Sequence, residues 1–153
     1  MTAAKRKPTA SQEDYLEAIL ALLRDGGTAR VRDIAQRLGV SNPSVSGALK
    51  TLARRGWVCY EPYGRVELAA AGRKAAQRVT RRHEVLQRFL TELAGLESAT
   101  AEQNACRIEH VVDEATMRAL RHLMDFATHS AAGRRFLAAL GKARDRDGAE
   151  RKA

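Results

Sequence analysis

The sequence predicts a mainly α-helical protein whose first half also contains one short β-hairpin. Aromatic residues make up only 5% of the 153 residues while Ala and Leu are abundant, which favours helices over sheets. Apolar residues recur at helical spacing along most of the chain, whereas residues 57–68 alternate as strands do. Hydrophobic residues reach 44%, enough for a folded core in one domain or two small ones.

The first expected helix covers residues 11–24, SQEDYLEAILALLR. Ser11 is a good N-cap, and Asp14 three residues later can complete a capping box. The apolar face at 3.6-residue spacing comprises Tyr15, Ile19, Leu22 and Leu23. Gly26 and Gly27 are expected to end the helix.

Two short helices are expected next, separated by a tight turn at Gly39. The first has the apolar positions Val31, Ile34, Ala35 and Leu38. Ser41 or Asn42 caps the second helix, and Pro43 fits its first turn, where no backbone donor is lost. The second helix directs Val45, Ala48, Leu49 and Leu52 inward and Ser44, Ser46, Gly47 and Lys50 outward.

A β-hairpin follows Gly56. Residues 57–61, WVCYE, alternate as a strand in which Cys59 is expected to be packed. Residues 62–65 form a turn with Arg65 at its tip, and residues 66–68 form the returning strand. Two helices joined by a glycine turn and followed by a basic-tipped hairpin predict a winged helix-turn-helix domain.

A winged helix reads DNA by placing the start of its second helix in the major groove and its hairpin against the backbone or minor groove. The small polar residues of the second helix suit this close approach to base edges. The candidate DNA contacts are Arg32, Ser41, Asn42, Pro43, Ser44, Ser46, Lys50 and Arg65. The alternative is a helix pair that serves only for packing.

The net charge of +9 is confined to one half of the chain. Residues 1–82 carry 16 Lys and Arg against 7 Asp and Glu, whereas residues 83–153 carry 11 of each. A basic half joined to a neutral half favours a nucleic-acid module fused to a regulatory or dimerising one, although a solvated basic surface would give the same balance.

The second half is expected to be all-helical and to form a dimerisation and metal-binding domain. A long helix over residues 70–94 connects the halves, and further helices are expected at 102–112, 113–127 and 130–140. Apolar residues available to a dimer interface are Ala115, Leu120, Leu123, Met124 and Phe126. The predicted organisation is a disordered basic arm at 1–10, the winged helix at 11–72, the helical domain at 73–141 and a mobile charged tail at 142–153.

Six side chains are candidate metal ligands. Cys106, Glu109 and His110 are at positions i, i+3 and i+4, so they share one face of a helix and form half of a transition-metal site. Asp14 and Glu17 also share a face, and His83 lies mid-helix between the two segments. Taken alone, the first group also fits surface residues beside a buried cysteine, the acidic pair fits a solvated capping pair, and His83 fits a packed or surface histidine.

Four segments of the chain resemble the diphtheria toxin repressor family of metal-dependent regulators, especially its two-domain manganese transport regulator branch. They are EDYLEAI (13–19), ARVRDIAQRLGVSNPSVS (29–46), RRHEVLQRFL (81–90) and ACRIEHVV (105–112), and the resemblance covers residues 11–126. The resemblance implies that His83, Cys106, Glu109 and His110 are metal ligands. It also implies acidic ligands at Asp14 and Glu17, as in the manganese branch.

The family pattern is mixed in this chain. Asp14 and Glu17 follow the manganese branch, whereas Cys106 follows the iron branch. The ancillary site of the iron branch has a Glu where this chain has Gln87 and a His where it has Glu102, so that site is not expected here. Carboxylates suit Mn(II) and a thiolate favours softer ions, so the cofactor is expected to be Fe(II) or Mn(II), with a slight preference for Fe(II), and Co(II) or Zn(II) as substitutes in vitro.

The sequence therefore predicts a metal-dependent DNA-binding repressor of metal-ion homeostasis. A homodimer would place two recognition helices about 34 Å apart on a palindromic double-stranded operator. No long apolar run or secretory signal is present, so a cytoplasmic protein is expected. The alternatives are a winged-helix regulator that senses an organic ligand or thiol oxidation without metal, and a zinc hydrolase with Glu109 as base, which lacks an HExxH motif.

Overall fold

Helix α4 (Ala70–Arg88) contributes residues to both of the two units into which the chain divides, because the division falls between Thr80 and Arg81. Our computed structural model describes residues 7–62 and 64–150, the side chains of 147–150 excepted. The expected domain boundary between residues 72 and 73 lies within α4, before this division. Most of the expected N-terminal arm and the last three residues of the expected tail lie outside the described residues.

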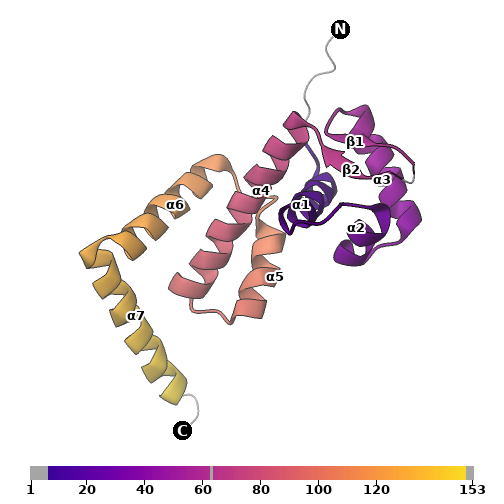
Figure 1. The fold of residues 1–153 in the computed structure, drawn as a ribbon. Coiled ribbons are helices and arrows are strands. Elements are labelled where there is room, and N and C mark those ends of the chain that lie inside the picture. The colour runs from indigo at the N-terminus through magenta and orange to yellow at the C-terminus, as the bar shows by residue number, and fades with distance from the viewer. Residues whose placement is uncertain (1–6, 63, 151–153) are drawn as a thin grey trace. The chain divides into compact units, whose positions relative to one another are not determined.

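The N-terminal unit is a winged helix (Figure 1). Helices α1 (Ala10–Arg24), α2 (Val31–Leu38) and α3 (Asn42–Arg54) precede the antiparallel strands β1 (Val58–Tyr60) and β2 (Val66–Leu68). Cys59 pairs with Glu67 across the hairpin, and Ala29 adds an isolated bridge to Val66. The order of elements confirms the winged helix expected from the sequence.

Helix α1 begins earlier than the sequence suggested. Its N-cap is Thr9, whose hydroxyl accepts the Gln12 N–H, while the Gln12 side chain accepts the Thr9 N–H. This reciprocal pair satisfies two backbone donors at the helix end, so Ser11 and Asp14 are not the cap. The buried face is centred on Leu16, Ile19 and Leu20 instead of the stripe expected through Tyr15, Leu22 and Leu23, which are partly buried.

The core of the N-terminal unit lies between the three helices and the hairpin. Ile34, Val45, Leu49, Leu52 and Val66 are fully buried there. Cys59 is exposed, so the expectation that it is packed was wrong. In the alternation of β1, Val58 takes the buried side and Cys59 the other side.

The turn between α2 and α3 forms as expected. Gly39 caps α2 with φ of 66°, a left-handed conformation that favours glycine. The Ser41 hydroxyl accepts the Ser44 N–H at 3.3 Å and caps α3, and Pro43 lies in the first turn of α3. This arrangement leaves Asn42, Pro43 and Ser44 exposed at the start of α3.

The C-terminal unit consists of helices. After α4 the chain makes a π-helical turn, η1 (Phe89–Leu93), and continues with α5 (Ser98–Ile108), α6 (Glu114–His129) and α7 (Ala131–Glu150). The expected single helix over 70–94 thus changes type after Arg88. Helix α7 extends ten residues beyond the expected end at residue 140 and includes most of the charged segment that was expected to be a tail.

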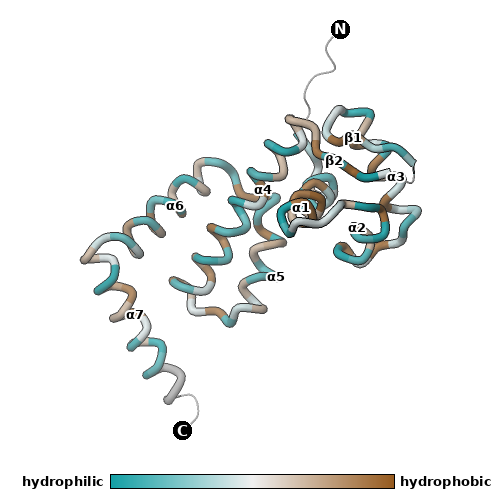
Figure 2. Tube along the Cα trace, viewed as in Figure 1, coloured by the Kyte–Doolittle hydropathy of each residue, from teal (hydrophilic) through white to brown (hydrophobic). Residues whose placement is uncertain are grey.

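A small core joins α4, α5 and α6. Leu86, Ala105 and Met117 are buried at its centre. Along α6, hydrophobic and hydrophilic residues alternate (Figure 2), as expected for a helix with one buried face. Met124 is 2% exposed in the single chain, so it is not available to the expected dimer interface, whereas Leu123 and Phe126 remain exposed. In the described part of the chain, no helix is both long enough and apolar enough to cross a membrane.

Candidate metal centre

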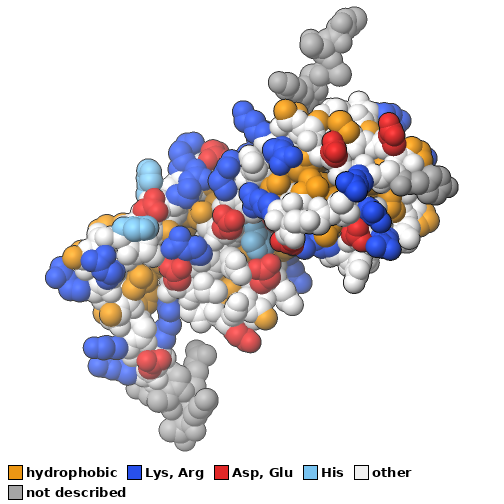
Figure 3. Space-filling view, in the orientation of Figure 1, with side chains coloured by type: hydrophobic (Ala, Val, Ile, Leu, Met, Phe, Trp, Pro, Cys, Tyr) orange, Lys and Arg blue, Asp and Glu red, His pale blue; other side chains and the backbone are white. Residues whose placement is uncertain are grey.

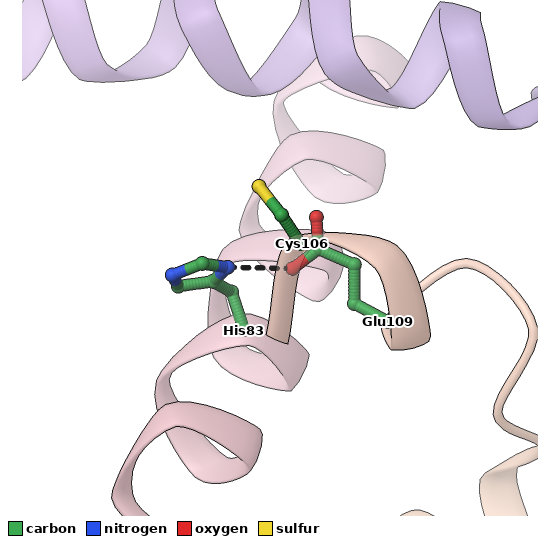
Figure 4. A group of neighbouring side chains, drawn as sticks. All are labelled: His83, Cys106 and Glu109. Atoms are coloured by element: carbon green, nitrogen blue, oxygen red, sulfur yellow. Dashed lines mark hydrogen bonds and ion pairs between the residues drawn. The ribbon is translucent and has the colours of Figure 1, made fainter. Parts of the chain in front are cut away.

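Three potential ligands converge in the C-terminal unit from segments far apart in the sequence. His83 comes from α4, and Cys106 and Glu109 come from the end of α5 (Figure 4). One donor atom from each of these residues lies within 4.8 Å of the other two. With His110, whose Nε2 lies 3.4 Å from Glu109 Oε1, the C-terminal unit brings together four of the six ligands that the sequence predicted.

The end of α5 explains how its side chains reach one point. The helix stops at Ile108, so the expected helix through residue 112 is too long. Glu109 nevertheless keeps helical dihedrals of −56° and −30°, and its N–H donates to the Ala105 carbonyl. Cys106 and Glu109 therefore keep their i, i+3 relation on one face, while His110 lies in the following turn.

Glu109 is the buried anchor of the cluster, with 1% of its surface exposed. Its Oε2 lies 2.8 Å from His83 Nδ1, and its Oε1 lies 3.4 Å from His110 Nε2. That second contact is an ion pair without hydrogen-bond geometry, because Oε1 has no hydrogen-bond partner among the described residues. A buried carboxylate oxygen without a hydrogen bond is costly, and coordination of a cation by that oxygen would offset the cost.

His83 is held between two carboxylates. The hydrogen bond with Glu109 raises the pKa of His83 to about 9, assisted by Glu102 and opposed by burial. Glu102 Oε2 lies 3.0 Å from the other ring nitrogen, Nε2. The metal-free histidine is thus protonated at neutral pH, and a metal ion would displace a proton from it.

The donor set fits a divalent transition metal. An imidazole, a thiolate and a carboxylate are ligands that Fe(II), Co(II) and Zn(II) share, and further carboxylates would also suit Mn(II). Cys106 is exposed and Glu109 is buried, so the cluster combines access from solvent with a fixed charge.

Asp14 and Glu17 belong to α1 in the N-terminal unit, one helical turn apart. Their role as metal ligands stays a prediction.

Sequence reasoning missed Glu102 as part of the cluster. Glu102, Cys106 and Glu109 are at i, i+4 and i+7, so they form one stripe along α5. That spacing was available in the sequence, but only the contact with His83 shows that the first member of the stripe takes part.

The predicted DNA contacts all lie in the N-terminal unit, and most of them lie in α3 or just before it. Ser41, Asn42, Pro43, Ser44 and Lys50 are exposed, and Ser46 is half-buried. Arg32 at the start of α2 and Arg65 before β2 are also exposed, and Arg32 pairs with Asp33 at 3.2 Å. Ser41 and Ser44 share a hydrogen bond of 2.8 Å that orders the first turn of α3. Their contact with DNA stays a prediction.

Comparisons with known proteins agree with both units. The N-terminal DNA binding domain of iron dependent repressors matches residues 7–66, and the metal binding and dimerisation domain matches residues 69–137. The transcriptional regulator MntR of Escherichia coli is 42% identical over 109 residues, which are 71% of this chain and 70% of that protein. The chain belongs to the iron-dependent repressor family. It is therefore a metal-dependent, DNA-binding transcriptional regulator.

Other transcriptional regulators are also similar to this chain. The regulator MntR of Geobacillus kaustophilus is 40% identical over 67% of this chain and 72% of its own length. A solved manganese-dependent transcriptional repressor in complex with manganese is 29% identical, with a TM-score of 0.70. The match covers 75% of this chain and 53% of that one, so the chain spans about half the length of that repressor.

The solved structure of IdeR of T. acidophilum is 26% identical with a TM-score of 0.66, over 76% of this chain and 54% of that one.

Proposed function

We propose that this repressor binds its operator when a divalent transition metal is held jointly by its two units. The ligands are His83, Cys106, Glu109 and His110 in the C-terminal unit and Asp14 and Glu17 on α1. The observation that carries the proposal is the convergence of donor atoms from α4 and α5 within 4.8 Å, around a buried carboxylate oxygen that lacks a hydrogen bond in the described part of the chain.

Shared ligation gives the chain a way to couple metal to DNA. When bound, a divalent ion supplies the positive charge that allows several carboxylates and a thiolate to approach one another. Asp14 and Glu17 move with the DNA-reading unit, and the other ligands move with the C-terminal unit. Without metal the carboxylates repel one another. Metal favours the DNA-competent arrangement of the protein only to the extent that this arrangement binds the ion more tightly than other arrangements do.

The ion is Fe(II) or Mn(II), and Cys106 makes Fe(II) the stronger activator. One of the similar solved structures is a manganese-dependent repressor in complex with manganese, which supports Mn(II). The thiolate of this chain supports a softer ion, and it is a property of the chain itself. Co(II) and Zn(II) should occupy the same ligands in vitro.

The operator is a palindromic duplex in the cytoplasm, bound by a dimer. Exposed Leu123 and Phe126 on α6 and Phe136 on α7 offer apolar surface for the second copy. Hydrophobic side chains are visible among Lys and Arg over these two helices (Figure 3). Lys50 and Arg65 would contact the DNA backbone or bases on each half-site.

The test is an anaerobic titration of the full chain with Mn(II), Fe(II), Co(II) and Zn(II), with binding to operator DNA followed by fluorescence anisotropy. Tight DNA binding should require metal and reach half-saturation at the lowest concentration with Fe(II). Glu109→Gln should lose metal-dependent DNA binding but keep the fold. Equal DNA affinity with and without every metal would disprove the proposal.

A further inference from the structure

The two ring nitrogens of His83 face different carboxylates. Nδ1 points toward Glu109, on the side where Cys106 also lies (Figure 4). Nε2 is 3.0 Å from Glu102 Oε2. The side chain of Glu109 is fully buried, whereas that of Glu102 is 53% exposed, so the two carboxylates have different surroundings.

We propose that Glu102 is a positioning residue that accepts a hydrogen bond from His83 Nε2–H and thereby presents the Nδ1 lone pair to the metal. The inference rests on the proposed metal centre. Glu102 itself does not ligate the ion. It holds the imidazole in the Nε2–H tautomer and fixes the plane of the ring.

Imidazole chemistry requires that the two ring nitrogens have different roles. A neutral histidine has one nitrogen with a proton and one with a lone pair, and only the second can bind a metal. A carboxylate that accepts the N–H orients the ring and makes the ligating nitrogen more basic. Nδ1 is the nitrogen that contacts Glu109, and it lies on the side of Cys106 (Figure 4). Ligation through Nδ1 therefore requires Nε2 to carry the proton when metal binds.

The stripe on α5 explains how one helix supplies both kinds of carboxylate. Glu102 lies one helical turn before Cys106, and Glu109 lies about one turn after it. The turn at Glu109 is buried and that at Glu102 reaches solvent. The exposed position suits Glu102 as a hydrogen-bond acceptor, because water can hydrogen-bond to the carboxylate oxygen that does not contact His83.

The experiment compares the full chain with Glu102→Ala, Glu102→Gln and the control Glu97→Gln. Glu97 is an exposed carboxylate just before α5, so its substitution makes the same change of charge without contact to His83. Co(II) titration measures the number of ions and their affinity. Nitrogen-15 NMR of the Zn(II) form reports which nitrogen of His83 binds metal and whether Nε2 keeps its proton.

We expect Nδ1 ligation with a protected Nε2–H in the native protein. Glu102→Ala should weaken Co(II) binding by about 10- to 100-fold at unchanged stoichiometry and expose Nε2–H to rapid exchange. Glu102→Gln still offers an oxygen acceptor, so it should keep the tautomer and recover part of the affinity. Glu97→Gln should match the native chain.

Two results would overturn the inference while leaving the proposed function intact. One is native Co(II) affinity and an unchanged Nε2–H signal in Glu102→Ala. The other is loss of one ion per chain in that variant with the remaining ion unaffected, which would make Glu102 a ligand of a second ion. Failure of the native chain to bind any of the metals would instead reject the proposed metal centre itself.

Discussion

At the scale of single residues, Cys106 has the greatest influence on which metal the cluster prefers. Its thiolate is the one soft donor in the predicted ligand set, which otherwise consists of carboxylates and imidazoles. Because it is exposed, its replacement should disturb packing little.

Cys106→Glu should shift the metal response toward Mn(II) relative to Fe(II) and Co(II), because it replaces a soft donor by a hard one. The measurement is the metal concentration needed for half-maximal DNA binding with each ion. The Co(II) form of the native protein should also show a thiolate-to-metal charge-transfer band that the variant lacks.

Cys106→Ser is the matched control, since it removes the thiolate while adding no carboxylate. If native protein lacks the band and Cys106→Glu leaves the metal ranking unchanged, Cys106 is not a ligand. The remaining five predicted ligands would then favour Mn(II).

At the scale of helices and turns, the N-terminus of α6 has an acid-sensitive cap. The Thr116 N–H donates to Asp113 Oδ1 at 2.7 Å and lowers the pKa of Asp113 below its ordinary value of 3.8. The negative charge of an ionised cap also interacts favourably with the positive end of the helix dipole.

We expect the ionised Asp113 to stabilise the fold above its ordinary pKa of 3.8, which is also its pKa in the unfolded chain. A lowered folded pKa means that this contribution is fully present above that value and is lost as the pH falls through the folded pKa. Urea unfolding from roughly pH 2 to pH 6 should therefore show a stability advantage of the native chain over Asp113→Asn that shrinks on acidification. A difference that is constant across this range would contradict the assignment.

The approach of α6 and α7 depends on one glycine. A Cβ at Gly133 would lie 2.1 Å from the Phe126 carbonyl oxygen, whereas a Cβ at Gly141 on the same helix would meet nothing within 4 Å. Alanine substitutions at these two positions therefore distinguish the effect of close helix packing, at Gly133, from the effect of helix propensity, at Gly141.

Gly133→Ala should destabilise the protein by about 1–3 kcal/mol because the helices must separate. Gly141→Ala should stabilise it by about 0.5–1 kcal/mol, since alanine is the better helix former. The free energy of unfolding from urea denaturation tests both. Equal effects of the two substitutions would show that α7 does not pack on α6 as described.

The sequence was most informative where the structure depends on local chemistry. Gly39, Ser41 and Pro43 predicted the turn and cap of α3 because dihedral preference and capping act over a few residues. The choice between neighbouring N-cap candidates was harder to predict. Thr9, and not Ser11, caps α1 because Thr9 forms reciprocal hydrogen bonds with Gln12. Glu102 was missed because its contact with His83 depends on how α5 lies beside α4, which periodicity does not describe.

At the scale of the whole molecule, the exposed aromatic residues of α6 and α7 should support the dimer. Phe126 is 52% exposed and Phe136 is 50% exposed. Phe126→Glu should raise the dimer dissociation constant by at least about 30-fold, since buried aromatic anchors at interfaces contribute 2 kcal/mol or more. Sedimentation velocity across a concentration series measures this.

Val40→Glu is the control for that substitution. Val40 is an apolar residue of the N-terminal unit that is 40% exposed, so it tests whether any added charge disturbs assembly. A native dissociation constant in Phe126→Glu would place the dimer interface elsewhere.

DNA binding should depend strongly on salt, because the positive charge is concentrated in residues 1–82. The logarithm of affinity should fall with the logarithm of salt concentration at a slope of about 0.9 per neutralised phosphate. Lys50→Ala should reduce that slope by about 1 if it contacts a phosphate, and it should leave Co(II) affinity unchanged. A flat salt response of the native chain would exclude phosphate contacts as the main source of affinity.

In helix α5, the residues that pack the core differ from the residues that lie near the metal centre, and this difference affects how the repressor can change during evolution. Ala101 and Ala105 are fully buried and carry the packing, while Glu102, Cys106 and Glu109 form the adjacent stripe that faces His83 or its surroundings. An exchange at position 106 alters a donor atom without creating a cavity in the core. A single substitution at position 106 could therefore adapt the repressor to a different metal supply while the helix, and the fold that depends on it, stays intact.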